Sequence, residues 1–258
     1  MSIIHIVQLG IIEGITEFLP ISSTAHLEIV QNLLKIPTTE FIKSFEIVIQ
    51  LGAIGAVILL YFRKIFFSFR YFLNICIAFI PTGIIGFILY KIIKAFFLGN
   101  IVLAACMLII GGIIIILYER KRKNASVLSV PRTVESLTVK ELIILGIIQA
   151  LAVIPGVSRS GAVIIGGRML GFSSPLITEF SFVLAVPTML VAVGYDLLKS
   201  GFSFSGSEWT NLGIGFITSF IVALIVIKWL LAYIRTHSFS VFGWYRVVVG
   251  LILLIFLV

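Results

Sequence analysis

Six long apolar stretches lie along the 258-residue chain, and each is long enough to cross a bilayer. They cover roughly residues 44–62, 75–93, 101–118, 176–198, 211–233 and 242–258. About 20 residues of α-helix span the ~30 Å hydrocarbon core of a membrane. The apolar runs are continuous and do not alternate with polar positions, which favours helices over the strands of a β-barrel. The pattern therefore predicts an all-α polytopic membrane protein with six transmembrane helices.

Two further apolar regions, 3–35 and 141–172, are interrupted near their middles by proline, serine and charged residues. Each is too polar at its centre for an ordinary span. The pattern is typical of a re-entrant pair, in which one helix enters the membrane, the chain breaks, and a second helix returns to the same side. Such breaks occur at membrane depth only where protein or a wet cavity surrounds them. We therefore expect two re-entrant helix pairs in addition to the six spans.

The two halves of the chain show a weak internal repeat. Leu9-Gly-Ile-Ile-Glu13 resembles Leu145-Gly-Ile-Ile-Gln149, and Pro20-Ile-Ser-Ser resembles Pro155-Gly-Val-Ser. Each half would hold one re-entrant pair and three spans. Because three is odd, the halves would have opposite topologies, and their broken segments would meet near the membrane midplane. Chance similarity between Leu- and Ile-rich segments is the alternative explanation.

This repeat divides a single membrane domain, residues 1–258, into three parts. The first inverted repeat covers 1–118, a basic loop covers 119–140, and the second inverted repeat covers 141–258. Basic loops lie on the cytoplasmic side of membranes, so the central loop is expected inside. Threading the spans outward from it places both termini outside. The first re-entrant pair then opens to the external side, and the second enters from the cytoplasm.

Composition agrees with a membrane protein. Hydrophobic residues make up 60% of the chain and charged residues 12%, against about 25% charged residues in soluble domains. The net charge of +8 comes from basic residues between the spans, and no nucleic-acid motif accompanies them, so no nucleic-acid partner is expected. The two cysteines lie inside apolar runs and are expected to be small packing residues, with no disulfide or metal role. No basic segment precedes the first apolar run, so no cleavable signal peptide is expected.

Polar side chains are concentrated in the middle of the first interrupted region. Glu13 and Glu17 are spaced i,i+4, so a helix places both carboxylates on one face. Ser22 follows Pro20 and precedes a helical run, which makes it an N-cap candidate. The helix N-terminus would offer free N–H groups and the positive end of the helix dipole to an anion. The hydroxyl and imidazole groups that follow are Ser23, Thr24 and His26.

The second interrupted region carries a matching group. Pro155-Gly156 breaks the chain, Ser158 can cap the next helix, and Arg159 lies at the start of that helix. Ser160 adds a hydroxyl, and Gly161 lets a ligand approach the backbone closely. Charged residues inside a membrane cost roughly 2.5–3.5 kcal/mol each on insertion scales, so they are usually functional or paired. Two helix N-termini, a guanidinium and several hydroxyls predict a site for phosphate or diphosphate.

Simpler structural roles compete with this interpretation. Arg159 could form a purely structural ion pair with Glu13 or Glu17, and isolated hydroxyls in membrane helices often bond to their own backbone. Glu46 and Glu179 lie near the start of matching spans and are expected to brace the core or line the cavity. Two more basic residues near span ends are expected to reach lipid head groups. These are Lys228 and Arg246.

The chain resembles the undecaprenyl-diphosphatase family, also called bacitracin-resistance proteins. Glu13-Gly-x-Thr-Glu17-Phe-Leu-Pro20-x-Ser-Ser-Thr-x-His26 is similar to the first motif of the family, and Pro155-Gly-x-Ser-Arg159-Ser-Gly161 to the second. The similarity extends along nearly the whole chain. Ala25 departs from the glycine expected in the first motif, and Glu28 stands where an apolar residue is expected. Neither difference removes a group that the chemistry needs. Further similar segments are Phe45–Gly52, Glu179–Phe182 and Trp244–Arg246.

The resemblance implies a phosphatase of the bacterial plasma (inner) membrane. It would hydrolyse undecaprenyl diphosphate to undecaprenyl phosphate and inorganic phosphate. This reaction recycles the lipid carrier for peptidoglycan and other cell-wall polymers, and it confers tolerance to bacitracin. The expected partners are the polyprenyl diphosphate and membrane lipids, and the sequence leaves open whether copies of the chain form a homo-oligomer. The active site would open to the external, periplasmic side.

Two routes for the reaction are consistent with these residues. Ser23 is the candidate nucleophile, with His26 or a nearby glutamate taking its proton. In the alternative, Glu13 or Glu17 activates a water for direct attack. The same two glutamates could bind a divalent cation, Mg²⁺ or Ca²⁺, but two ligands do not identify a metal. The predicted catalytic residues are Glu13, Glu17, Ser23, His26 and Arg159, and the predicted substrate-binding residues are Ser22, Thr24, Ser158, Ser160 and Gly161.

The rival interpretation is a transporter or flippase for an anionic lipid or a small anion. Inverted repeats and broken helices are common in transporters, and helix N-termini bind transported anions equally well. The first motif, however, offers more acid–base and nucleophilic groups than transport requires. A purely structural membrane scaffold would leave the cluster of intramembrane charges unexplained.

Overall fold

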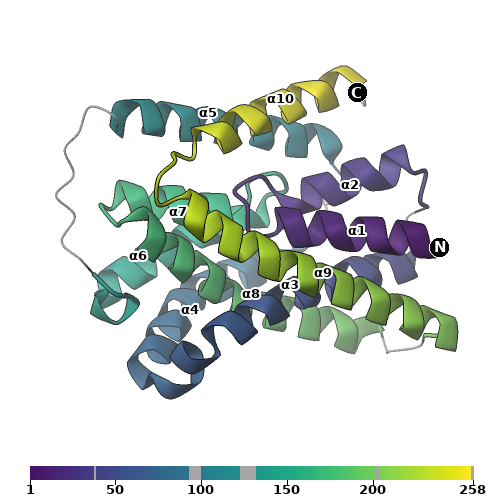
Figure 1. Cartoon of the computed structure of the whole chain (residues 1–258), viewed down its shortest axis with the longest axis horizontal. Coiled ribbons are helices and arrows are strands. Elements are labelled where there is room, and N and C mark those ends of the chain that lie inside the picture. The colour runs from purple at the N-terminus through teal and green to yellow at the C-terminus, as the bar shows by residue number, and fades with distance from the viewer. Residues whose placement is uncertain (38, 93–99, 123–131, 201–203, 257–258) are drawn as a thin grey trace.

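The computed structural model describes the chain except residues 38, 93–99, 123–131, 201–203 and 257–258 (Figure 1). The described residues form helices joined by turns and contain no strand. The helices, in chain order, are α1 (Ile3–Thr16), α2 (Ser23–Leu33), α3 (Glu40–Phe67), α4 (Phe69–Ile92), α5 (Ile101–Arg122), η2 (Val134–Ser136), α6 (Val139–Ala150), η3 (Leu151–Val153), α7 (Arg159–Met169), α8 (Ser174–Ser200), α9 (Gly206–Tyr233) and α10 (Ser240–Phe256).

Five described helices are long and apolar enough to cross a membrane, which makes the chain a polytopic membrane protein. These helices are α3, α4, α5, α8 and α9. They coincide with five of the six spans that the sequence predicts. The sixth corresponds to α10, which has 17 residues and is therefore about 26 Å long at 1.5 Å per residue.

Each interrupted region forms two short helices separated by a turn. The first region folds into α1 and α2, and the second into α6, η3 and α7. The two turns share an unusual backbone conformation at their last residue. Ser22 has a φ of 71° and Ser158 a φ of 68°, and residues other than glycine rarely adopt such positive φ values. The central basic loop that the sequence predicts includes residues 123–131, which lie outside the described part of the chain.

The two halves of the chain exchange helices. Helix α1 of the first half packs against α9 of the second, α6 of the second half packs against α4 of the first, and α10 lies along α5. Small residues permit these contacts, as they do between helices in lipid. A Cβ atom on Gly146 of α6 would lie 2.0 Å from the carbonyl oxygen of Ala78 in α4. Both termini lie on the same side of the molecule in Figure 1.

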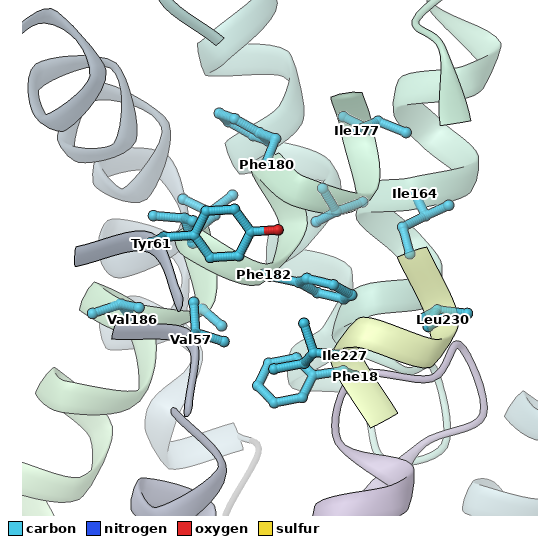
Figure 2. Close-up of a cluster of buried hydrophobic side chains, with 14 of the residues drawn as sticks. Phe18, Val57, Tyr61, Ile164, Ile177, Phe180, Phe182, Val186, Ile227 and Leu230 are labelled. Atoms are coloured by element: carbon cyan, nitrogen blue, oxygen red, sulfur yellow. The ribbon is translucent and has the colours of Figure 1, made fainter. Parts of the chain in front are cut away.

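The largest cluster of buried apolar side chains anchors the first turn (Figure 2). Phe18 of this turn is fully buried and meets Phe182 of α8 edge to face, with ring centroids 5.1 Å apart. Ile164 of α7 and Ile227 of α9 belong to the same cluster. The α1–α2 turn is therefore held inside the protein by side chains from three later helices.

Candidate active site

The α1–α2 turn and the turn before α7 meet inside the helix bundle. The hydroxyl of Ser160, at the start of α7, donates to the carbonyl oxygen of Leu19 in the first turn at 2.8 Å. A cavity of about 240 Å³ lies where the turns meet. Its lining residues are Glu17, Ser22, Ser23, Thr24, Gln50, Thr82, Gln149, Ala152, Val153, Ile154, Gly156, Ser158, Arg159, Thr188 and Met189.

A chain of three side chains joins the two motifs in this cavity. The Ser23 hydroxyl donates to Glu17 Oε2 at 2.5 Å, and Arg159 Nη2 donates to Glu17 Oε1 at 3.0 Å. The Glu17 side chain is 3% exposed and that of Arg159 is 10% exposed. Arg159 is held in place by a second bond, from Nη1 to the Ser181 carbonyl oxygen at 3.0 Å. The arrangement puts a hydroxyl, a carboxylate that can take its proton, and a guanidinium that can bind an anion side by side.

Two helices begin at the cavity, as the sequence predicts. Ser158 caps α7, because its Oγ accepts a hydrogen bond from the Gly161 amide at 3.2 Å. Ser22 holds the equivalent position before α2, but its side chain makes no capping bond and lies 3.5 Å from the Thr24 hydroxyl. The N-terminal amides of α2 therefore have no side-chain cap from Ser22. Both helix N-termini can contribute to an anion site.

His26 braces the first turn and does not contact Ser23. Its Nδ1 lies 2.7 Å from the Ser22 carbonyl oxygen, and its Nε2 lies 2.7 Å from the Tyr245 hydroxyl of α10. Because a carbonyl oxygen only accepts, Nδ1 must carry a hydrogen, and in the neutral imidazole Nε2 then accepts from the Tyr245 hydroxyl. His26 is absent from the cavity lining, and both ring nitrogens are occupied. Glu17, and not His26, therefore lies within hydrogen-bond distance of the Ser23 hydroxyl.

Glu13 lies one helical turn before Glu17 and is fully buried. Among the described residues, neither of its carboxylate oxygens has a hydrogen-bond partner. Its charged neighbours are Glu17, Glu46 and Arg159. No group of three or more His, Cys, Asp or Glu side chains that could hold a metal occurs in the described ranges. The Glu13–Glu17 pair falls short of such a group and offers at most two carboxylate side chains to a cation.

Arg246 corrects a prediction from the sequence. It does not reach lipid head groups, because it is 1% exposed and its hydrogen bonds within the described part of the chain all go to backbone carbonyls. Its Nη1 bonds to Pro20 O at 3.1 Å and to Val157 O at 3.0 Å, and its Nη2 bonds to Gly156 O at 2.9 Å. Further bonds reach α5, where the acceptors are the carbonyl oxygens of Met107 and Leu108. Arg246 therefore ties the two turns to each other and to α5.

The cavity is also lined by four neutral polar residues that the sequence analysis did not assign to the site. They are Gln50, Thr82, Gln149 and Thr188. One signal in the sequence pointed to Gln149, because it matches Glu13 in the repeated pattern Leu-Gly-Ile-Ile. Four of the predicted residues do not line the cavity: Glu13, His26, Ser160 and Gly161.

Neither Glu46 nor Glu179 lines the cavity. Glu46 accepts a hydrogen bond from Gln31 of α2. Glu179 accepts from Lys64 of α3 at 2.7 Å and from the Tyr71 hydroxyl of α4 at 3.2 Å. Both glutamates therefore join neighbouring helices, in agreement with the predicted bracing role.

The fold and the site together define a polytopic membrane protein in which two pairs of helices bring a serine, a glutamate and an arginine together in one cavity. Residues 6–252 match the family described as bacitracin resistance protein BacA, and the chain belongs to this family. It is 51% identical over 246 residues to the undecaprenyl-diphosphatase of Aquifex aeolicus, covering 95% of each chain. It is 49% identical to that of a Sulfurihydrogenibium species, with 98% of each chain covered. It is 46% identical to that of Wolinella succinogenes, covering 100% of this chain and 99% of the relative.

Proposed function

We infer that the chain is an undecaprenyl-diphosphatase. It hydrolyses undecaprenyl diphosphate to undecaprenyl phosphate and inorganic phosphate, and it is a bacitracin-resistance protein. Relatives with this name match the chain over nearly its full length. The observation that carries the assignment in the structure is the chain of bonds from Ser23 through Glu17 to Arg159.

In the proposed mechanism, Ser23 is the nucleophile. Its Oγ attacks the terminal phosphorus of the diphosphate, and the bond from that phosphorus to the bridging oxygen breaks. Glu17 takes the Ser23 proton and passes it to the departing oxygen. Arg159 and the N-termini of α2 and α7 stabilise the charge of the transferring phosphoryl group. The 2.5 Å bond between Ser23 and Glu17 supports this route. In the second route, Glu17 activates a water that attacks the same phosphorus directly.

A divalent cation at Glu13 and Glu17 is part of the proposal. Two neighbouring buried carboxylates repel each other, and Mg²⁺ or Ca²⁺ prefers carboxylate oxygens as ligands. The unpartnered oxygens of Glu13 fit this role. When bound, such a cation would neutralise charge on the diphosphate. If the cation is needed, EDTA should abolish phosphate release and Mg²⁺ or Ca²⁺ should restore it, whereas unchanged activity in EDTA would refute this part of the proposal.

We further propose that the halves form an inverted repeat with two re-entrant pairs and six spans. The exchange of helices between the halves and the shared φ of Ser22 and Ser158 support this topology. The basic end of α5, with Arg120, Lys121 and Arg122, supports a cytoplasmic position for the following loop. Both termini, and the opening of the active site, would then lie on the external side of the bacterial inner membrane.

The direct test is phosphate release from undecaprenyl diphosphate by the full chain in detergent. Detergent leaves no membrane compartments, so a transporter or flippase without phosphatase activity releases no phosphate. We expect release by the wild type and loss of at least about 100-fold in Ser23→Ala. The matched control is Ser207→Ala, a serine on the exposed first turn of α9. Near-normal turnover by Ser23→Ala would refute the serine route and favour the water activated by Glu17.

A further inference from the structure

Gln149 places an amide group on the wall of the cavity. It is the last but one residue of α6, and it is 1% exposed. Its Nε2 lies 3.0 Å from the hydroxyl oxygen of Thr82 in α4 and 3.0 Å from that of Thr188 in α8. The amide is therefore fixed between three helices that all border the cavity.

The orientation of this amide follows from the hydrogen bonds of the two threonines. The Thr82 hydroxyl donates to the Gly146 carbonyl oxygen at 2.7 Å, and the Thr188 hydroxyl donates to the Leu184 carbonyl oxygen at 2.9 Å. Each hydroxyl has one hydrogen, so toward Gln149 each can only accept. The group between them must supply two hydrogens, which only the NH₂ end of the amide can do. The amide oxygen Oε1 must therefore point away from both threonines.

This oxygen is a buried acceptor without a donor. Gln149 Oε1 has no hydrogen-bond partner among the residues that the structure describes. A buried polar atom left without a partner costs about 1–3 kcal/mol, and in native proteins such atoms usually bond to ordered water or a ligand. The cavity beside Gln149 has about 240 Å³, which is room for several waters at about 30 Å³ each.

We propose that Gln149 Oε1 binds and orients the water that attacks phosphorus in this reaction. The inference rests on the proposed phosphatase function and adds a residue to it. An oxygen that only accepts repels an ionised phosphate, and the hydroxyl hydrogens of the two threonines are already donated to carbonyl oxygens, so neither threonine can donate to a phosphate. Water can donate to Gln149 and keep a lone pair free for attack. Glutamine orients the attacking water in GTPases by the same chemistry.

The step balances in both routes of hydrolysis. In the serine route, the oriented water attacks the phosphorus of phospho-Ser23, and the bond from phosphorus to Ser23 Oγ breaks. One water proton passes to Glu17 and then to Ser23 Oγ, which regenerates the serine and releases inorganic phosphate. In the direct route, the same water attacks the terminal phosphorus, the bond to the bridging oxygen breaks, and Glu17 takes the proton. Gln149 holds the water in either case.

The test is the competition between water and methanol as phosphoryl acceptors. Wild type and Gln149→Leu, in full-length form, are given undecaprenyl diphosphate in buffer with methanol, and inorganic phosphate and methyl phosphate are both measured. Methanol cannot occupy the water position in the same way, so its reaction depends less on Gln149. We expect kcat for hydrolysis to fall about 10- to 100-fold with KM within about threefold, and the ratio of methyl phosphate to phosphate to rise.

Two further variants separate this role from a structural one. Gln149→Glu, whose protonated acid can donate to one threonine and keeps an acceptor oxygen, should return the product ratio toward the wild-type value. Gln8→Leu, on the exposed part of α1, is the matched control and should leave rates and ratio unchanged. Equal loss of both products in Gln149→Leu, or full hydrolysis by it, would overturn the proposal. Absence of phosphate release by the wild type would instead overturn the phosphatase function.

Discussion

Replacement of Arg246 by lysine should disconnect the two turns that form the cavity. The guanidinium reaches five carbonyl oxygens, and a lysine ammonium has three hydrogens on a single atom. Pro20 lies in the first turn, and Gly156 and Val157 lie in the second. A single ammonium cannot bridge both turns and α5 in the geometry that the fork of the arginine provides.

The size of the effect follows from which carbonyls depend on Arg246. Met107 and Leu108 lie inside α5, where their carbonyl oxygens also accept hydrogen bonds within the helix. Without Arg246 these two carbonyls therefore keep one hydrogen bond each. The carbonyls of Pro20, Gly156 and Val157 receive no backbone hydrogen bond among the described residues. A buried carbonyl without a partner costs about 1–3 kcal/mol, so three of them correspond to roughly 3–9 kcal/mol if lysine satisfies none. If lysine satisfies one or two of these carbonyls, we expect the free energy that holds the turns in place to fall by about 2–5 kcal/mol.

The assay compares phosphate release and thermal unfolding for wild type, Arg246→Lys and a control, Arg235→Lys. Arg235 follows α9 and is exposed, so its replacement should change neither quantity. Because displacement of a catalytic group by about 1 Å costs about 100-fold in rate, Arg246→Lys should lose at least that much in kcat/KM. A variant that retained more than about a third of the wild-type kcat/KM would show that the turns do not depend on this arginine.

Two smaller predictions concern packing and the histidine. Gly146→Ala should lower the unfolding temperature in detergent and reduce activity, because the added Cβ would lie 2.0 Å from the Ala78 carbonyl oxygen. Gly213→Ala is the control and should change neither quantity, because its added Cβ meets open space. Equal unfolding temperatures for the two variants would contradict the close packing at Gly146. Tyr245→Phe removes the hydrogen bond to His26 Nε2, which is worth about 0.5–1.5 kcal/mol, so phosphate release should fall by no more than about tenfold. A complete loss of activity would instead mean that the tyrosine takes part in the chemistry.

The helical architecture could be predicted from the sequence because its signal is strong. Apolar runs of about 20 residues have few explanations other than a membrane helix, and five long helices occur where such runs lie. The interruptions by proline, glycine and serine also marked the two turns correctly, because these residues break helices for steric reasons. The family is confirmed as well, since both motifs carry several polar residues at fixed spacing. The inverted topology and the roles of the site residues stay predictions.

The parts that were missed depend on contacts between distant segments. Arg246 lies near the end of an apolar helix, where a basic residue usually reaches the membrane surface. Nothing in the neighbouring sequence shows that Arg246 instead donates to two turns far away in the chain. Pro20 lies 226 residues before it and Gly156 lies 90 residues before it. Gln149 was overlooked because a neutral amide in an apolar helix is a much weaker signal than a charge. The sequence likewise identifies His26 as an imidazole near Ser23, but not the direction in which its ring points.

The ion pair between Glu17 and Arg159 explains why each half of the chain contributes part of the site. Each charge alone costs roughly 2.5–3.5 kcal/mol to insert, and removal of one partner from a buried pair typically destabilises by about 3–5 kcal/mol. Glu17 comes from the first motif and Arg159 from the second, so neither half can neutralise its own charge in this pair. Assembly of the halves therefore forms the predicted anion site and removes the cost of the separate charges in the same step. In the proposed mechanism, a substrate that brings additional negative charge would compete with Glu17 for Arg159, and the freed carboxylate could then take the proton of Ser23.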